Sequence, residues 1–218
     1  MKKINREFFS PTSLRLREAP EGGDSRLIEG YAIVFDAPSV AFYEDEHDVV
    51  REIIDKSAVT RELLDASDIK MTLFHDRTLI LARSKDGEGT LTYDIDDHGV
   101  SFSFEAPHTA DGDKAVELVK RGDISGCSFA FSTYYDDPSY VSQTVKNVDG
   151  KRETTYHVKQ MLGIYDFTLA ADPAYDTTSV EAREAFNAQR AEAAALKKRQ
   201  REQLDEMRAV VDKYNRFV

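Results

Sequence analysis

Apolar and polar residues alternate over much of the chain, which is typical of β-strands with one buried face. Turn-forming residues such as Asp86-Gly87 and Asn147-Val148-Asp149-Gly150 separate the alternating segments. Because most neighbouring strands are joined by short turns, we expect them to pair antiparallel in a meander. The predicted strands cover residues 27–35, 69–74, 79–83, 90–95, 100–106, 129–134, 153–161 and 164–170.

Two segments have apolar residues at helical spacing instead. Residues 53–65 are predicted to form a short helix. Residues 109–120 are predicted to form a longer helix, which Thr109 or Asp111 can cap and which Gly122 ends. The expected fold is therefore α+β and mainly β: a curled antiparallel sheet or barrel flanked by a few helices, with a C-terminal helical tail.

The two ends of the chain differ in composition from this β-rich part. Residues 1–26 are polar and finish in Glu21-Gly22-Gly23-Asp24, which predicts a flexible N-terminal arm. Residues 183–218 contain no Gly or Pro and are rich in Ala, Glu, Lys and Arg, which predicts a helical tail. We therefore expect one domain over residues 27–182, between the arm and the tail.

The charge of the chain argues against a general nucleic-acid-binding protein. The formal net charge is −11, whereas binding to phosphates needs a concentrated basic surface. Residues 183–218 hold nine Lys or Arg against six Asp or Glu, a net charge of +3, which leaves −14 for residues 1–182. The tail could attract the acidic body or an acidic partner, but a solvated surface is the simpler interpretation.

The cysteine count and the length of the apolar runs indicate the cellular compartment of the protein. Cys127 is the single cysteine, so no intramolecular disulfide is expected. No apolar run approaches the roughly 18 residues of a membrane helix, and the basic start has no apolar stretch behind it, so we expect neither a membrane span nor a signal peptide. A soluble, reducing compartment, the cytosol, is the simplest interpretation. His47, His98 and His108 lie in polar turns without metal-site spacing, and we expect no metal and no cofactor.

Three separated motifs supply the residue types that nucleophilic catalysis needs. His75 ends a predicted strand, Ser128 follows the small residues Ser125-Gly126-Cys127, and Asp166 lies in the first half of the last predicted strand. A serine hydroxyl is a weak nucleophile that needs a hydrogen-bonded base, and histidine is the commonest base. A carboxylate can fix the tautomer of that histidine and stabilise its cation. The motifs therefore indicate a serine protease.

Two alternatives concern the nucleophile. Ser128 could be a turn serine that bonds its own backbone. Cys127 could be the nucleophile in its place, but its serine neighbours bring no cation to lower the pKa of the thiol, which favours a small core residue. In the alternation of the strand, Ser128 points away from the side of Phe129 and Phe131, a direction that is available to a cleft.

Together these residues resemble the prohead serine protease family of tailed bacteriophages, capsid-maturation enzymes related in fold to the herpesvirus assemblins. The resemblance covers residues 27–183. It rests on the order and spacing of Glu29-Gly30-Tyr31-Ala32, Phe74-His75-Asp76, Leu81-Ala82-Arg83, the segment from Gly122 to Phe131, and Asp166-Phe167-Thr168-Leu169 followed by Pro173-Ala174-Tyr175.

The resemblance implies a role for each motif. The nucleophile of the family matches Ser128 and its general base matches His75. The third member matches Asp166, whereas assemblins use a second histidine, for which His157 is the candidate. Phe74 stands where the family often has Asn, a departure that concerns the substrate pocket rather than the catalytic roles.

By that resemblance, the protein is a serine endopeptidase that acts by acyl transfer inside the phage prohead, in the host cytoplasm. Its partners would be the major capsid protein precursor and the scaffold segment that it removes, and it would also cleave itself; self-association is open. Arg83 could assist the oxyanion, although a surface ion pair is the simpler role. The alternatives are a catalytically inactive scaffold or capsid-assembly protein of the same fold, and a small barrel that serves as a binding module. Convergence of His75, Ser128 and Asp166 would separate these readings.

Overall fold

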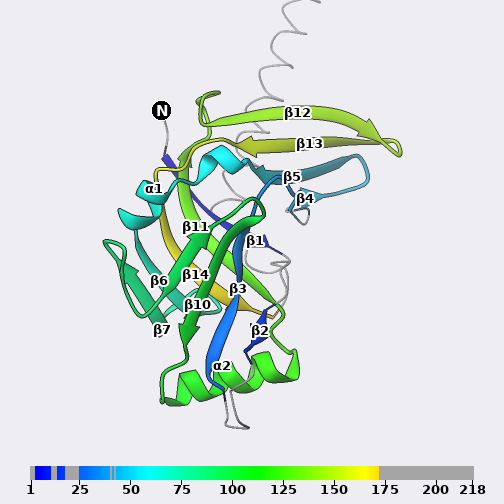
Figure 1. Ribbon diagram of the computed structural model, residues 1–218. Helices are drawn as coiled ribbons and strands as arrows, with labels where there is room; N and C mark the ends of the chain where they lie inside the picture. Colours follow the sequence, from blue (N-terminus) through cyan, green and yellow to red (C-terminus); the bar gives the residue numbers. More distant parts are fainter. Residues whose placement is uncertain (1–2, 11–13, 18–24, 40, 42, 172–218) are drawn as a thin grey trace, which may run out of the picture. The chain divides into compact units, whose positions relative to one another are not determined.

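The computed structural model describes residues 3–10, 14–17, 25–39, 41 and 43–171, and this part is mainly β (Figure 1). Its strands form three open sheets, so of the two expected arrangements the curled sheet is confirmed rather than the barrel. The six-stranded sheet has the order β1 (Lys3–Ser10), β11 (Gly126–Tyr134), β14 (Gly163–Ala170), β6 (Asp68–Leu73), β7 (Asp76–Lys85) and β8 (Glu88–Gly89).

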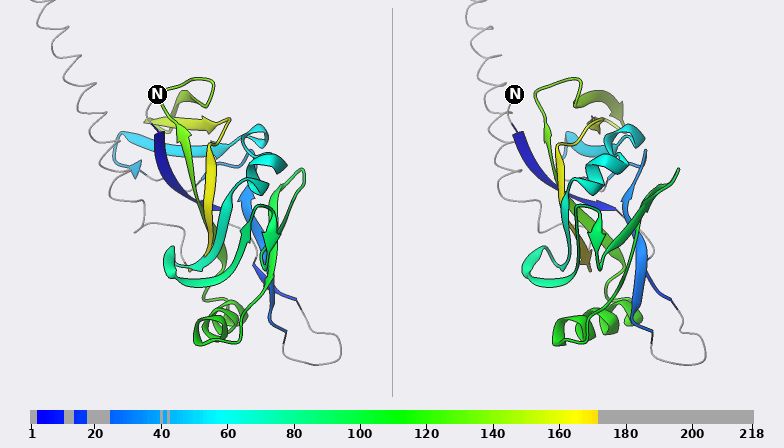
Figure 2. Two further views of the ribbon diagram at one scale, coloured as in Figure 1. Left: turned by 90° about the vertical axis from the view of Figure 1, so that its left-hand side faces the viewer. Right: turned by 60° about the vertical axis from the view of Figure 1, so that its left-hand side comes forward.

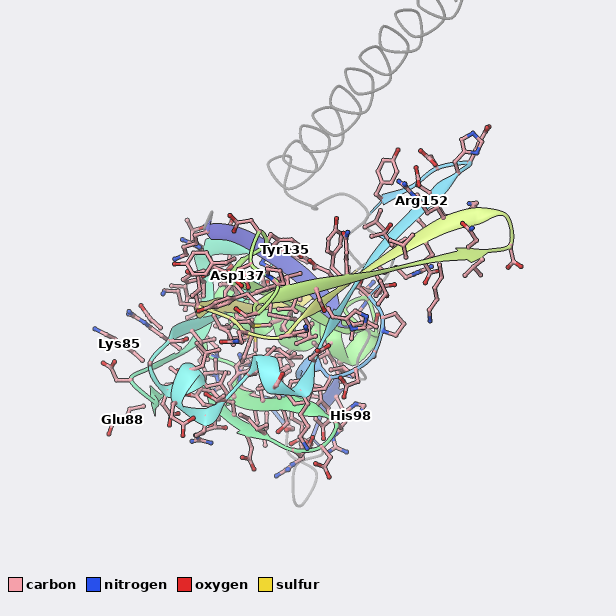
Figure 3. All side chains as sticks on the ribbon, turned by 90° about the horizontal axis from the view of Figure 1, so that it is seen from above. Lys85, Glu88, His98, Tyr135, Asp137 and Arg152 are labelled. Atoms are coloured by element: carbon pink, nitrogen blue, oxygen red, sulfur yellow. The ribbon has the colours of Figure 1, made fainter. Side chains whose placement is uncertain are left out.

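Two four-stranded sheets accompany it. The first has the order β2 (Arg15–Leu16), β3 (Leu27–Val34), β10 (Gly99–Glu105) and β9 (Thr92–Ile95). The second has the order β12 (Val141–Val148), β13 (Lys151–Val158), β5 (Asp48–Ile54) and β4 (Tyr43–Glu44). In the second sheet Arg152 reaches across to β5, where its Nε lies 2.7 Å from Asp48 Oδ1 (Figure 3). The helical elements are η1 (Lys56–Ala58), α1 (Arg61–Asp65) and α2 (Ala110–Arg121).

The core lies between the six-stranded sheet and the β3–β10 sheet. Phe129 of β11 and Phe167 of β14 are fully buried, and the ring of Phe167 lies 6.4 Å from that of Phe102 on β10. Strand alternation puts these side chains on one face of the six-stranded sheet, and the residues next to them in each strand point to the other face.

The helix expected over residues 109–120 is confirmed. The Thr109 side chain accepts a hydrogen bond from the Gly112 amide at 3.2 Å, and Gly122 ends the helix at a φ of 77°. The helix expected over residues 53–65 is wrong at its start. Ile53 and Ile54 end strand β5, where they pair with β13, and α1 is confined to Arg61–Asp65. Their β-branched side chains suit a strand, and the pairing outweighs the weak helical spacing.

The expected antiparallel pairing holds for most of the strands, but two pairs of strands are parallel. Strand β14 runs parallel to β6, and β13 runs parallel to β5. Each pair is separated by a long stretch of intervening chain, which leaves the strands free to run in the same direction. The remaining pairings between strands are antiparallel.

The stretch 1–26, which the sequence sets apart as an arm, includes strands β1 and β2. Figure 2 shows β1 in dark blue alongside β11 in green and β14 in yellow. The backbone of β1 pairs with β11 from Lys3 opposite Tyr134 to Ser10 opposite Cys127. The tail expected over residues 183–218 lies outside the described residues. Among the described helices, none has the length and apolarity needed to cross a membrane.

Candidate active site

The register of the six-stranded sheet places Ser128 and Asp166 on the face opposite the core. Ser128 on β11 pairs with Thr168 on β14, and Ala130 pairs with Asp166. Ser128 and Asp166 are therefore diagonal neighbours on one face. Such neighbours lie roughly 7–8 Å apart, a distance that the ring of a histidine can bridge.

His75 comes from the turn between β6 and β7. The turn has two residues, Phe74 and His75, with φ angles of 55° and 57°. Strand β6 runs parallel to β14, with Thr72 opposite Thr168 and Leu73 opposite Leu169. The turn begins directly after Leu73, so it lies next to the part of β14 that carries Thr168. The fold thus delivers His75 to the sheet face that holds Ser128 and Asp166.

The three side chains form one chain of hydrogen bonds. His75 Nε2 lies 2.9 Å from Ser128 Oγ, and His75 Nδ1 lies 2.9 Å from Asp166 Oδ1. Ser128 is 2% exposed and Asp166 is 3% exposed, whereas the His75 side chain is 13% exposed. The structure therefore brings together the three residues that the sequence singles out, with the histidine on the solvent side.

The partners of the imidazole determine its tautomer. An ionised carboxylate can only accept hydrogen bonds, so in the neutral ring Nδ1 carries the proton and donates it to Asp166. Nε2 is then the acceptor for the Ser128 hydroxyl. This is the tautomer that a general base for Ser128 needs.

Cys127 does not share this arrangement. It is fully buried on the core face, and burial raises the pKa of its thiol far above the usual range. Its Sγ lies 3.4 Å from the Ser128 carbonyl oxygen. A buried thiol without a nearby base is inert, which supports its interpretation as a core residue.

His157, the alternative third member, lies elsewhere. It is on β13, where its Nδ1 is 3.4 Å from Asp55 Oδ1 and its Nε2 is 3.5 Å from Thr144 Oγ1. The position next to His75 is taken by Asp166. The residue that contacts His75 Nδ1 is therefore a carboxylate and not His157.

Sequence reasoning missed Thr168, whose side chain contacts the backbone of His75. The backbone amide of His75 donates to Thr168 Oγ1 at 2.8 Å, and Thr72 Oγ1 donates to the same oxygen at 2.9 Å. Thr168 lies two residues after Asp166 in the same strand. The alternation that places Asp166 on this face therefore places Thr168 there too, and this signal could have identified it.

Arg83, the group that the sequence offers for the oxyanion, is engaged in an ion pair. Arg83 forms a two-point ion pair with Asp68, with Nε to Oδ1 at 2.6 Å and a second nitrogen to Oδ2 at 2.7 Å. This pair, together with Lys70, holds the pKa of Asp68 below its usual range, and it lies at the end of β6 opposite to His75.

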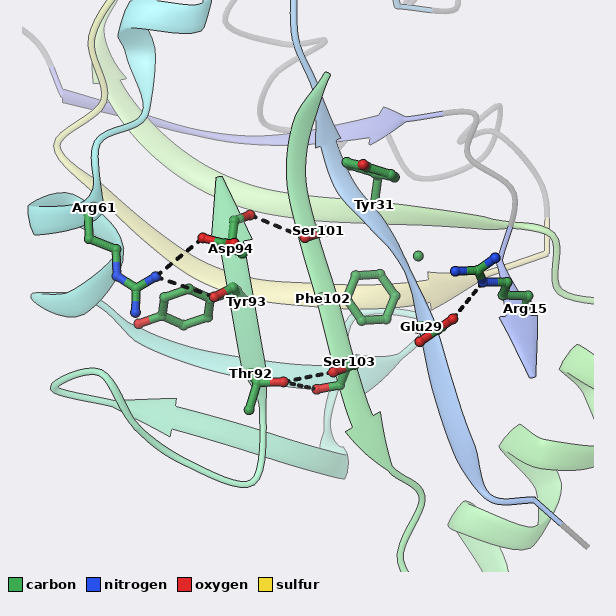
Figure 4. Close-up of a pocket in the computed structure, with 11 residues that line it drawn as sticks. Arg15, Glu29, Tyr31, Arg61, Thr92, Tyr93, Asp94, Ser101, Phe102 and Ser103 are labelled. Atoms are coloured by element: carbon green, nitrogen blue, oxygen red, sulfur yellow. Dashed lines mark hydrogen bonds and ion pairs between the residues drawn. The ribbon is translucent and has the colours of Figure 1, made fainter. Parts of the chain in front are cut away.

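A cavity of about 630 Å³ lies on the other side of the core, on the outer face of the β9–β10–β3 sheet (Figure 4). The guanidinium of Arg61 lies over the Tyr93 ring there, 5.2 Å from its centroid. Neither His75, Ser128 nor Asp166 lines this cavity. Its lining is mostly polar: Arg15, Glu29, Gly30, Tyr31, Arg61, Thr92, Tyr93, Asp94, Ser101, Phe102 and Ser103.

One known protein family matches most of the chain. The family model described as caudovirus prohead serine protease matches residues 12–193, a range that contains His75, Ser128 and Asp166. No curated protein matches the chain. Among solved structures, the chain is similar to the capsid assembly protease gp21 of bacteriophage T4. The identity is 13%, the match covers 78% of this chain and 98% of that chain, and the TM-score is 0.40.

Proposed function

Since this chain belongs to the caudovirus prohead serine protease family, we propose that it is a serine endopeptidase of capsid maturation with Ser128, His75 and Asp166 as its catalytic triad. One observation carries the proposal: the His75 ring is hydrogen-bonded to Ser128 Oγ and to Asp166 Oδ1, each at 2.9 Å. A nucleophile, a base and a group that orients the base are the three parts that acyl transfer requires.

The reaction proceeds through an acyl-enzyme. His75 Nε2 takes the proton of Ser128 while Oγ attacks the carbonyl carbon of the scissile peptide bond. The imidazolium then gives this proton to the leaving amine, and the acyl group stays on Ser128. A water molecule, deprotonated by His75 Nε2, releases the acyl group. Asp166 stabilises the imidazolium in both steps through the bond to Nδ1.

The proposed substrates are the scaffold segment of the major capsid protein precursor and the enzyme itself. The proposed place of action is the inside of the prohead, in the cytoplasm of the host. Both proposals rest on membership of the family.

The test is coexpression of the chain with a capsid precursor, followed by mass spectrometry of the products. Wild-type protein should shorten the precursor, and Ser128→Ala should not. Ser132→Ala is the matched control, because Ser132 is also buried on β11 but its hydroxyl bonds Tyr165 OH at 2.7 Å. If Ser128→Ala processes the precursor as wild type does, the triad is wrong. If wild type does not process it, the inactive assembly protein is favoured.

For the domain organisation, we propose that residues 183–218 serve packaging or assembly and are dispensable for the chemistry. The support is their composition and their charge, which is opposite in sign to that of the rest of the chain. A chain that ends at Arg183 should fold and cleave a peptide but enter precursor shells poorly. Unfolding of this truncated chain would assign the tail to the core instead.

A further inference from the structure

The turn that carries His75 has an unfavourable backbone conformation. Phe74 and His75 both have positive φ angles, 55° and 57°, in the left-handed region that non-glycine residues rarely adopt. Two such residues in succession persist only where the surrounding structure holds them. The contacts that hold this turn therefore contribute to the position of the imidazole.

One of these contacts is a hydrogen bond from outside the turn. The amide of His75 donates to Thr168 Oγ1 at 2.8 Å. Thr168 lies on β14, opposite Ser128 in the register and two residues from Asp166. A single side chain thus ties the backbone of His75 to the strand that carries Asp166.

The Thr168 hydroxyl is itself held in place. It accepts from the His75 amide and from Thr72 Oγ1, and it donates to the Thr72 carbonyl oxygen at 3.1 Å. A hydroxyl has one proton to donate and two lone pairs, so this group uses its full capacity. Thr72 and Thr168 are both completely buried, so water does not compete for these bonds.

We infer that Thr168 is a positioning residue of the active site, which fixes the His75 backbone so that its ring bridges Ser128 and Asp166. This inference rests on the proposed function. Without the acceptor, the strained turn can relax, and Nε2 leaves the position at which it can take the Ser128 proton. Thr168 acts through His75 and not on the substrate.

Four variants of the full chain separate positioning from general stability. Thr168→Val keeps the shape of the side chain and removes the acceptor for the His75 amide. Thr72→Val is the matched control, because it makes the same change in the same cluster and leaves the bond between His75 and Thr168 in place. Thr168→Ser restores the hydroxyl. A combined Thr72→Val and Thr168→Val variant avoids leaving the Thr72 hydroxyl without a partner, should the single variant fold poorly.

Two measurements are made on each variant. The first is the hydrogen exchange rate of the His75 amide, which does not depend on activity. The second is the rate at which a fluorophosphonate probe labels Ser128 with release of fluoride, and Ser128→Ala serves as the blank. The labelling needs a positioned base but no knowledge of the peptide substrate.

We expect Thr168→Val to expose the His75 amide to exchange and to slow labelling on the order of 100-fold, the effect of misplacing a reacting group by about 1 Å. The combined variant should behave in the same way, whereas Thr72→Val and Thr168→Ser should stay close to wild type. Normal exchange and labelling in Thr168→Val would overturn the inference, as would equal losses in Thr72→Val. If wild-type protein is labelled no faster than Ser128→Ala, the proposed function fails, and His75 amide exchange still decides the role of Thr168.

Discussion

Two hairpin turns of this protein both have two central residues with positive φ angles, and they differ in sequence. The β12–β13 turn consists of Asp149 and Gly150, with φ angles of 51° and 82°, and the β6–β7 turn consists of Phe74 and His75, with 55° and 57°. Two-residue hairpins favour positive φ angles at both positions, and Asp-Gly is a sequence that adopts them readily. Phe-His is not. The residues of the first turn adopt positive φ angles readily. The second turn instead contains His75, whose ring is bonded to Ser128 and Asp166.

The two turns are also held differently. A Cβ atom added at Gly150 would meet nothing within 4 Å, so no packing constrains this position. The amide of His75, in contrast, is bonded to Thr168 on β14, and its ring is bonded to Ser128 and Asp166. Local sequence favours the conformation of the Asp149-Gly150 turn, and tertiary contacts stabilise the Phe74-His75 turn. This difference can be tested from both sides.

The largest effect is expected from the carboxylate that orients the His75 ring. In Asp166→Asn the amide can donate to Nδ1, which shifts the proton to Nε2 and removes the acceptor for Ser128. The kcat for peptide cleavage should fall roughly 10⁴-fold, with the fold retained. The control is Asp55→Asn, because Asp55 also lies next to a histidine, His157, but away from Ser128. Equal activities of the two variants would contradict the triad.

A methyl group at Gly150 should destabilise the Asp149-Gly150 turn through its backbone alone. The φ angle of 82° is unfavourable for alanine, and no atom lies near enough to clash. Gly150→Ala should therefore lower the free energy of unfolding by about 1 kcal/mol, as measured by urea denaturation, and leave cleavage unchanged. Gly163→Ala is the control, because its φ is not positive and its nearest contact would be an ordinary 3.5 Å. Similar losses in both variants would show that backbone strain is not the cause.

A substitution in the Phe74-His75 turn should have the opposite effect on stability. Asn adopts the left-handed conformation more readily than Phe, so Phe74→Asn should raise the free energy of unfolding by about 0.5–1 kcal/mol. The contact between Lys114 Nζ and the Phe74 ring, at 5.8 Å from the centroid, is exposed and offsets little of this gain. Urea denaturation measures the change. A loss of stability would show that the Phe74 ring contributes more to the turn than its backbone costs.

The smallest effect is expected at the far end of β6 and β7. Arg83→Gln removes the ion pair with Asp68, but both side chains are partly exposed and solvent screens the pair. Melting temperature and cleavage rate should change little. The pKa of Asp68, followed by NMR, should rise toward its ordinary value, because Arg83 is the largest cause of its depression. A large fall in cleavage rate would instead indicate that Arg83 assists the oxyanion.

Sequence and structure agree best where the signal is local. The alternation of strands such as β10 and β11 and the capping of α2 by Thr109 follow from residues a few positions apart, and both were predicted. The motifs that contain His75, Ser128 and Asp166 could be recognised because each is short and their order resembles that of a known family. Pattern alone overextended the first helix, since a few apolar residues at helical spacing also fit the end of β5.

The sequence by itself determined strands such as β10 and β11, the Asp149-Gly150 turn and the three residue types at the site, because neighbouring residues set these features. The tertiary structure alone decided that β14 lies beside β6, that Ser128 and Asp166 are diagonal neighbours, and that Thr168 holds the His75 backbone. The physical reason is distance along the chain. Strand pairing and register depend on packing between segments tens of residues apart, and a one-residue slip would turn every side chain to the other face.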